Sequence, residues 1–180
     1  DLGEPVSLYI AEDEVKYGSD NVIENGDFET GSPSPWITPS DSTGMNVFTI
    51  STDHASGQYS LQMTVGDAND SAYVEFPTKI GVQYRLIFYI TIPNHDALSS
   101  VRFKLGHSGD VDAYRGDVYP DTSITTKQKI DIYFIPTQAT SRFTIAESGS
   151  SNDANVYLDS ITCYELLDHT YKLMAVNDTI

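Results

Sequence analysis

Basic and aromatic side chains that alternate with apolar ones are the residues of this sequence best suited to bind a ligand. The chain has 10 lysines and arginines against 26 aspartates and glutamates, so a concentration of basic residues on outward positions is unexpected. A tyrosine ring can cover the apolar side of a sugar, while an arginine donates hydrogen bonds to hydroxyl or carboxylate groups. We therefore expect one ligand-binding face, formed by Arg85, Tyr89, Arg102, Lys104, Tyr133 and Arg142.

The same basic residues have a structural alternative. They can pair across strands with Asp131 and Glu75, and such pairs of opposite charge each stabilise a sheet by roughly 0.2–1 kcal/mol. Binding and pairing both stay open from the sequence. A second candidate surface is the polar, aromatic segment that contains Tyr114, Arg115 and Tyr119. We expect it to be a long loop, and loops presented by a rigid scaffold often carry recognition.

Runs of alternating apolar and polar residues predict the elements that position these side chains. The runs are separated by clusters of Gly, Asn, Asp, Ser and Pro, and helical periodicity is almost absent. The spacing leaves no room for crossover helices, so the sheets should be antiparallel. We therefore predict an all-β protein with an antiparallel β-sandwich. The expected strands are 46–51, 59–65, 72–76, 84–92, 101–105, 129–135, 141–146 and 155–164.

Alternation also assigns the two faces of each strand, because successive side chains point to opposite sides. In the segment 84–92, one face carries only aromatic and aliphatic side chains, and we predict that this face lies in the core. The residues expected to point inward are Tyr84, Leu86, Phe88, Ile90, Ile92, Val101, Phe103, Leu105, Ile130, Ile132, Phe134, Phe143 and Ile145.

The composition narrows the class of function. A net charge of −16 argues against nucleic acid or an anionic membrane as the partner. No run approaches the roughly 20 apolar residues of a membrane helix, so we expect no membrane insertion. Cys163 is the only cysteine, which excludes an intrachain disulfide and a cysteine-based zinc motif. Motifs for a nucleophile or a phosphate loop are missing, and the acid pair Asp110 and Asp112 does not fix the carboxyl separation of a glycosidase. We do not expect an enzyme.

An ordered series of segments resembles the carbohydrate-binding modules that are attached to xylanases and laminarinases. The segments are NVIENGDFETG at 21–31, the single tryptophan Trp36, SGQYSLQM at 56–63, GVQYRLIFYITI at 81–92 and VYLDSI at 156–161. The resemblance covers about residues 21–167 and implies a jelly roll of the galactose-binding-like type, with 21–36 and 155–166 as its first and last strands. We expect 1–20 to be a linker or the edge of a preceding module, and 168–180 to be a C-terminal extension or linker.

What the resemblance implies about function is a non-catalytic module that attaches a larger protein to a polysaccharide, outside the cell or at a cell or virion surface. Its partners would be the polysaccharide and other domains of a longer parent protein. The same jelly roll also serves in assemblies. The alternative is therefore a structural or adhesion domain of a cell-surface assembly or of a virion, such as a phage tail, head fibre or collar. Trp36 takes a position that in the family more often closes one end of the core, and ligand contact is its other possible role.

The resemblance also implies a structural calcium ion. Family members draw its ligands from the acid of the NGDFE motif, from carbonyls near the Ser-Gly turn and from the aspartate of the last strand. Here these positions are Glu29 with Asp27 beside it, Gly57 and Asp159. Calcium takes about six to eight oxygen ligands, which carboxylates and main-chain carbonyls supply. The alternative is that Asp159 accepts backbone N–H bonds while Asp27 and Glu29 stay in solvent.

Overall fold

The computed structural model describes residues 8–11, 17–18, 20–38, 48–51, 56–65, 71–93, 101–121, 124, 126–147, 154–167 and 172–175 of the 180-residue chain. Every regular element within these ranges is a β-strand, so the prediction of an all-β protein is confirmed. These ranges contain no helix that is long and apolar enough to span a membrane.

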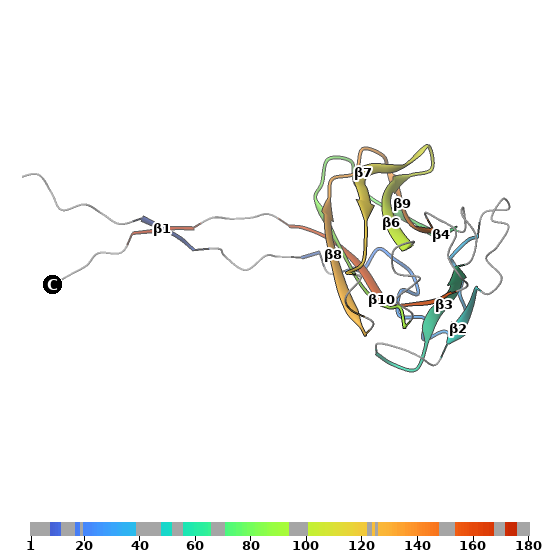
Figure 1. Ribbon diagram of the computed structural model, residues 1–180. Helices are drawn as coiled ribbons and strands as arrows, with labels where there is room; N and C mark the ends of the chain where they lie inside the picture. Colours follow the sequence, from blue (N-terminus) through green and yellow to red (C-terminus); the bar gives the residue numbers. More distant parts are fainter. Residues whose placement is uncertain are drawn as a thin grey trace, which may run out of the picture.

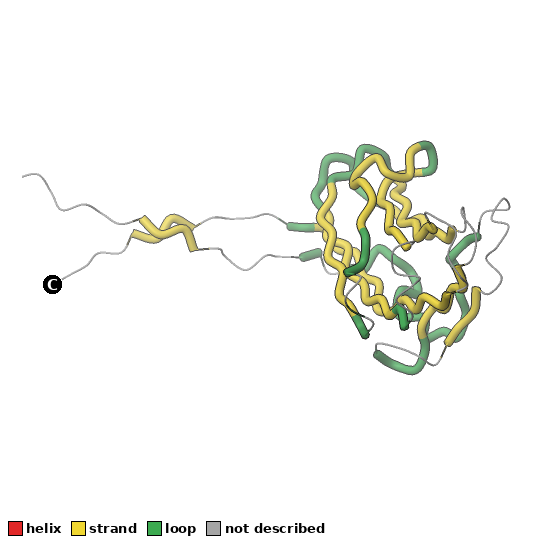
Figure 2. Tube along the Cα trace, viewed as in Figure 1, coloured by secondary structure: helices red, strands yellow, loops and turns green. Residues whose placement is uncertain are grey.

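Two antiparallel sheets form a sandwich (Figure 1). One sheet contains β2 (Phe48–Ser51), β3 (Ser60–Val65), β10 (Ala154–Glu165), β5 (Tyr84–Thr91) and β8 (Gln128–Phe134), in this spatial order. The other contains β4 (Ser71–Pro77), β9 (Thr140–Glu147), β6 (Val101–His107) and β7 (Asp110–Val118). The consecutive strands β4, β5 and β6 alternate between the two sheets. Figure 2 shows the strands joined by loops and turns, with no helix among the described residues. This crossing between layers is the arrangement of the predicted jelly roll.

Side chains that point inward from both sheets form one hydrophobic core. Phe88 of β5 lies between Phe103 of β6 and Phe143 of β9, with ring centroids 4.8 Å and 4.9 Å away. All three side chains are fully buried. The residues predicted to face inward are buried, and Ile130 packs against the core while partly exposed. Alternation therefore separates core from surface correctly in these strands.

Residues 21–36 do not form the first strand of the sandwich, contrary to the expectation from the resemblance. They form successive turns, in which Asn25 and Phe28 have φ angles of 50° and 58°. Asparagine adopts this left-handed conformation more readily than most residues, and an extended strand contains no such residue. The turns pack against a β-bulge in β10, where the main-chain N of Ile161 donates to the Gly26 carbonyl at 2.8 Å.

The segment 110–118 is strand β7 and not the expected loop. It forms an edge strand that pairs with β6 through an irregular register, with shifts on both sides of the pair Leu105 and Arg115. Its sequence, DVDAYRGDV, carries polar residues on both faces. Edge strands are often polar and bulged in this way, which hides the alternation that reveals a central strand.

The two ends of the domain lie side by side. Tyr17 pairs with Leu166 in an isolated antiparallel bridge. Beyond this bridge, β1 (Leu8–Ala11) pairs with β11 (Lys172–Ala175) in a two-stranded antiparallel sheet that Figure 1 shows apart from the sandwich. Both strands fall in segments that we expected to act as linkers or extensions.

Candidate functional site

The expected ligand-binding residues are divided between the two sheets. Three of them, Arg85, Tyr89 and Tyr133, lie on the outer face of the five-stranded sheet. The other three, Arg102, Lys104 and Arg142, lie on the outer face of the four-stranded sheet. The outer faces of a sandwich point in opposite directions, so the six residues do not form one face. Alternation distinguishes inside from outside but does not tell to which sheet a strand belongs.

Tyrosines gather on the outer face of the five-stranded sheet, which we call the tyrosine face. Its members are Tyr17, Tyr89, Tyr133, Tyr157 and Tyr164. The register places Arg85 of β5 between Tyr164 on β10 and Tyr133 on β8. Tyr17 joins from the N-terminal side, with its ring centroid 6.3 Å from that of Tyr164. Tyr133 is 46% exposed and Tyr17 is 37% exposed, while the other three are half-buried.

Sequence reasoning missed Tyr157 and Tyr164. Both point outward from β10, but the β-bulge between Asp159 and Thr162 adds a residue between them. Counting by strict alternation from Tyr157 therefore assigns Tyr164 wrongly to the core side. The signal was present in the chain, because the buried Ile161 and Cys163 on either side of Thr162 mark the change of phase.

Asp131 of β8 holds Arg85 on the tyrosine face. Arg85 Nε donates to Asp131 Oδ1 at 2.8 Å and Nη2 donates to Oδ2 at 2.5 Å, so the pair is bidentate. The guanidinium carbon lies 5.4 Å from the ring centroids of both Tyr17 and Tyr133, and Nη1 donates to the Tyr17 hydroxyl. Hydrogen bonding by Arg85 lowers the pKa of Asp131 below its ordinary value. The arginine is therefore engaged by a carboxylate and two aromatic rings.

Tyr89 lies farther along β5 and has a different neighbour. The Nζ atom of Lys127 is 4.5 Å from the centroid of its ring, a distance at which a cation is attracted to an aromatic face. Tyr157 lies on the adjacent strand β10, opposite Thr91. The tyrosine face thus presents rings at more than one level along β5.

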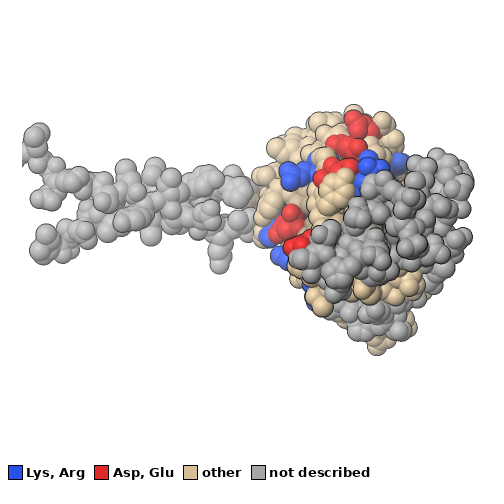
Figure 3. Space-filling view, viewed as in Figure 1, with Lys and Arg blue, Asp and Glu red and all other residues tan. Residues whose placement is uncertain are grey.

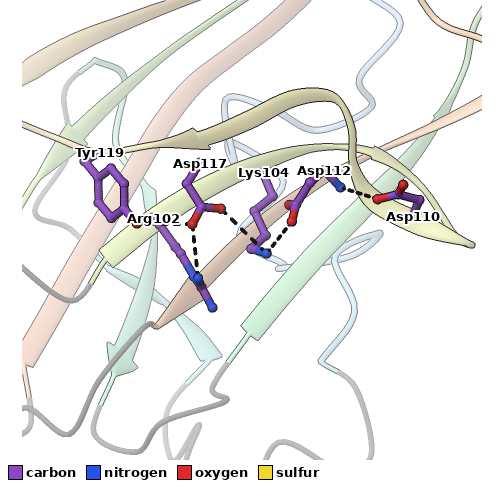
Figure 4. Close-up of polar contacts among 6 residues, drawn as sticks. All are labelled: Arg102, Lys104, Asp110, Asp112, Asp117 and Tyr119. Atoms are coloured by element: carbon purple, nitrogen blue, oxygen red, sulfur yellow. Dashed lines mark hydrogen bonds and ion pairs between the residues drawn. The ribbon is translucent and has the colours of Figure 1, made fainter.

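The outer face of the four-stranded sheet carries basic residues that are bound to carboxylates, and we call it the charge-paired face. Arg102 Nη1 lies 3.1 Å from Asp117 Oδ2. Lys104 Nζ lies 2.9 Å from Asp112 Oδ2 and 3.6 Å from Asp117 Oδ1. Figure 4 shows Asp117 between the two cations, with Tyr119 donating to the same carboxylate at 3.1 Å. In Figure 3, acidic and basic side chains are accordingly interspersed on the described surface in view.

Arg142 on the same face is also paired. Its Nε and Nη2 atoms donate to Glu75 Oε1 at 3.1 Å and 2.6 Å, and its guanidinium carbon lies 3.9 Å from the centroid of the Tyr73 ring. The pairs with Asp131 and Glu75 that the sequence left open as the structural alternative are therefore formed. Because they are partly exposed, each stabilises the fold by about 1 kcal/mol or less.

Trp36 and Tyr114, both candidates for ligand contact, pack against the core. Trp36 is 6% exposed, with ring centroids 6.2 Å from Phe28 and 5.9 Å from Phe143. Tyr114 is partly buried and stacks on Phe134 at 5.8 Å. Trp36 therefore lies in the core, which is the first of the two roles expected for it. Ligand contact by Trp36 and by Tyr114 stays a prediction.

Glu29 and Asp159, two of the expected calcium ligands, meet at one turn. Glu29 Oε1 accepts hydrogen bonds from the main-chain N of Gln58 at 2.8 Å and of Tyr59 at 3.0 Å. Asp159 Oδ2 accepts a bond from the main-chain N of Ser56 at 2.8 Å. Asp159 is buried, whereas Glu29 is exposed. The two carboxylates are thus brought to the same short stretch of main chain.

The donor set suits calcium in its chemistry but supplies few side chains. Gly57 has a φ angle of 68°, and a side chain there would collide with the Glu29 carboxylate. Asp27 is exposed and accepts a bond from the Glu29 N. The described residues contain no group of three or more His, Cys, Asp or Glu side chains placed to hold a metal. An ion here would need main-chain carbonyls as further ligands, and the N–H bonds to Asp159 match the alternative without an ion, so calcium stays a prediction.

The acid pair Asp110 and Asp112 is engaged within the β6–β7 hairpin. Asp112 pairs with Lys104, and Asp110 Oδ1 accepts a bond from the Asp112 N at 3.2 Å. A pocket of about 450 Å³ lies at the end of the sandwich where the chain enters and leaves. Two of the charged residues that line it, Lys79 and Glu165, pair with each other at 2.6 Å.

Comparison with known proteins gives a match in structure but not in sequence. No family model matches the sequence, and no curated protein matches it either. Among solved structures, TmCBM61 in complex with β-1,4-galactotriose is 19% identical, covers 82% of this chain and 99% of its own, and has a TM-score of 0.54. The CBM22-1 xylan-binding domain from Paenibacillus barcinonensis Xyn10C is 12% identical over 78% of this chain and 92% of its own, with a TM-score of 0.60.

The same fold also occurs as one part of larger proteins. Tailspike protein 4 of bacteriophage CBA120 is 11% identical, covers 81% of this chain but 21% of its own, and has a TM-score of 0.59. At these identities the likeness is one of fold. The resemblance read from the ordered segments is confirmed at that level, and the chain has the jelly-roll β-sandwich fold of carbohydrate-binding modules.

Proposed function

We propose that this chain is a non-catalytic glycan-binding module that attaches a larger protein to a polysaccharide outside the cell or at a cell or virion surface. The glycan lies on the tyrosine face. The observation that carries the proposal is the gathering of Tyr17, Tyr89, Tyr133, Tyr157 and Tyr164 on one outer face of the sandwich.

The chemistry of this face supports a sugar as the ligand. Tyrosine rings bury apolar area at low cost in side-chain entropy, and their hydroxyl groups can hydrogen-bond to hydroxyls of a bound molecule. The sheet beneath them is rigid, because Phe88 and its neighbours pack the opposite side of β5. Among the described residues, the charge-paired face carries fewer tyrosine rings, and there Arg142 lies over Tyr73 and Tyr119 donates to Asp117. Several solved modules with this fold carry a glycan in their names, which supports the same conclusion.

The experiment that tests the proposal is a binding screen with the full chain. Affinity electrophoresis against xylan, β-1,4-galactan, β-glucan, arabinan and polygalacturonate would be followed by calorimetry with oligosaccharides of any polymer that retards the protein. We expect retardation by at least one polymer and a 1:1 stoichiometry with its oligosaccharides. Absence of binding to the whole set, with protein shown to be folded by circular dichroism, would contradict the proposal.

The second candidate function is a structural or adhesion domain of a virion or cell-surface assembly. The observation that favours it is the likeness to the bacteriophage tailspike protein, which has a similar TM-score to the modules above. In that case a partner protein would cover the tyrosine face. A chain that fails to bind every polysaccharide, and whose tyrosine variants lose association with a partner domain, would support this second function.

We also propose a structural calcium ion held by Glu29, Asp159 and main-chain carbonyls near Gly57. The support is the convergence of two carboxylates on one turn. An ion bound there would fix the turn and the bulge of β10 relative to each other.

A further inference from the structure

One carboxylate on the tyrosine face, Asp131, engages two cations. It forms the bidentate pair with Arg85, and its Oδ2 lies 3.7 Å from Lys129 Nζ. Its side chain is 30% exposed and that of Arg85 is 19% exposed, so the pair lies at the surface on which the glycan is proposed to rest. What an arginine can offer a ligand depends on which of its donors are already used.

We propose that Asp131 determines the specificity of the tyrosine face, by holding Arg85 so that the face accepts neutral glycans and rejects acidic ones. The proposal rests on the proposed function and names the class of glycan that this site takes. Asp131 acts through Arg85 and is in that sense a positioning residue.

In Arg85, each of the three guanidinium nitrogens already donates a hydrogen bond within the protein. A guanidinium recognises a carboxylate best through two parallel N–H bonds, and the edge formed by Nε and Nη2 already makes such bonds to Asp131. Nη1 donates to the Tyr17 hydroxyl. The rings of Tyr17 and Tyr133 lie within 5.4 Å of the guanidinium carbon. A uronate could bind Arg85 bidentately at that edge only by displacing Asp131. At the other edge, it would share Nη2 with Asp131 and Nη1 with the Tyr17 hydroxyl, and would lie beside the Asp131 carboxylate.

Displacement would leave two carboxylates close together. If a uronate displaced Asp131, Asp131 would lose its arginine partner while a second carboxylate came to lie beside it. The ion pair of Arg85 with Asp131 would be replaced by an ion pair of Arg85 with the uronate, and the two carboxylates would repel each other. Hydrogen bonding by Arg85 already lowers the pKa of Asp131, so this carboxylate is charged and paired before a ligand arrives. The net charge of −16 adds repulsion of any polyanion at low salt. A neutral sugar meets none of these costs, because its apolar side contacts the rings and its hydroxyls can donate to the carboxylate.

The test is a gain of binding. Asp131→Asn keeps the size of the side chain but removes its charge, and therefore releases Arg85 and Lys129. We expect wild type to bind a neutral polysaccharide and to bind polygalacturonate at least about tenfold more weakly, a difference of 1.4 kcal/mol or more. We expect Asp131→Asn to bind polygalacturonate about tenfold more tightly than wild type at low salt, and to lose this gain at high salt because the new contact is ionic.

Matched variants separate this role from a structural one. Glu75→Gln releases Arg142 from the same kind of pair on the opposite face, and we expect no gain for polygalacturonate. Adding Arg85→Gln to Asp131→Asn should remove the gain. If Asp131→Asn does not fold, Asp131→Ser serves as the second variant, with folding checked by circular dichroism.

Two results would overturn the inference. One is wild-type protein that binds polygalacturonate as tightly as its best neutral polymer. The other is a folded Asp131→Asn protein whose binding to polygalacturonate equals that of wild type. Wild-type protein that binds no polymer would refute the proposed function instead, and the response of Asp131→Asn to polygalacturonate would still decide whether Asp131 masks Arg85.

Discussion

Replacing single tyrosines on the tyrosine face should weaken glycan binding without unfolding the domain. Tyr133 is 46% exposed, and Tyr89 and Tyr157 are half-buried. If a sugar covers roughly 60 Å² of a ring, the lost burial at about 25 cal/mol per Å² is roughly 1.5 kcal/mol, or about a tenfold loss of affinity. The rings lie outside the core, so each change to alanine should lower the free energy of unfolding by only about 1 kcal/mol.

The assay is calorimetry with the oligosaccharide identified in the screen, together with urea unfolding of each variant. Tyr73→Ala is the matched control, because Tyr73 is a half-buried tyrosine on the charge-paired face. We expect it to lose a similar amount of stability and none of the affinity. If Tyr89→Ala, Tyr133→Ala and Tyr157→Ala all bind as tightly as wild type, the glycan does not lie on this sheet and the reasoning from the gathered rings is refuted.

Three further predictions concern the fold and the ions. If calcium binds near Asp159, chelation should lower the melting temperature by the equivalent of about 3 kcal/mol at a hundredfold excess of calcium over Kd. Asp159→Ala should remove this effect. Unchanged melting with and without EDTA, in protein shown to be metal-free, would contradict the site. Gly26→Ala should lower the free energy of unfolding in urea by about 1–3 kcal/mol, because the added methyl group would meet a main-chain carbonyl of β10. Gly116→Ala is the control and should lower it much less, because no atom lies within 4 Å of the added methyl group. Arg85 lowers the pKa of Asp131, so their pair stabilises the fold above the ordinary aspartate pKa of 3.8 and loses this effect as the pH falls through the lowered value. The stability of Asp131→Asn should therefore approach that of wild type in acid, and a constant difference from pH 7 down to about pH 2.5 would refute this linkage.

The strands were predictable from the sequence because most of them have one buried face. In β5 the alternation is unbroken, so inward and outward positions follow directly from it. Prediction from alternation fails in strands that do not have one continuous buried face. β7 is an edge strand with polar residues on both faces, and β10 contains an extra residue that reverses the phase between Tyr157 and Tyr164. The turns at 21–36 were misassigned for a different reason, since the resemblance supplied a strand where the Asn25-Gly26 pair alone indicated a turn.

The candidate site was only half predictable, and the reason is topological. Tyr89 and Tyr133 were assigned to one side, and they do share the tyrosine face. Arg102 and Arg142 were assigned to the same side but lie on the other sheet. A period of two carries no information about which strands become neighbours, because that depends on the order in which the chain crosses between layers. The cross-strand partners Asp131 and Glu75 were nevertheless correct, because Glu75 lies directly opposite Arg142 and Asp131 lies diagonal to Arg85, opposite Ile87.

The distribution of charge supports the proposal that this acidic chain recognises a neutral ligand. All four basic residues that were first expected to bind the ligand form ion pairs within the protein. On the charge-paired face these are Arg102, Lys104 and Arg142, and on the tyrosine face Arg85 pairs with Asp131. Cations neutralised in this way stabilise the sheets weakly and contribute little to attraction of a polyanion. What remains for recognition on the tyrosine face is the set of rings around Arg85, whose attraction for a sugar depends on contact area and not on charge. Binding of a neutral glycan to this face should therefore change little between low and high salt, whereas strong weakening by salt would show that the cations take part after all.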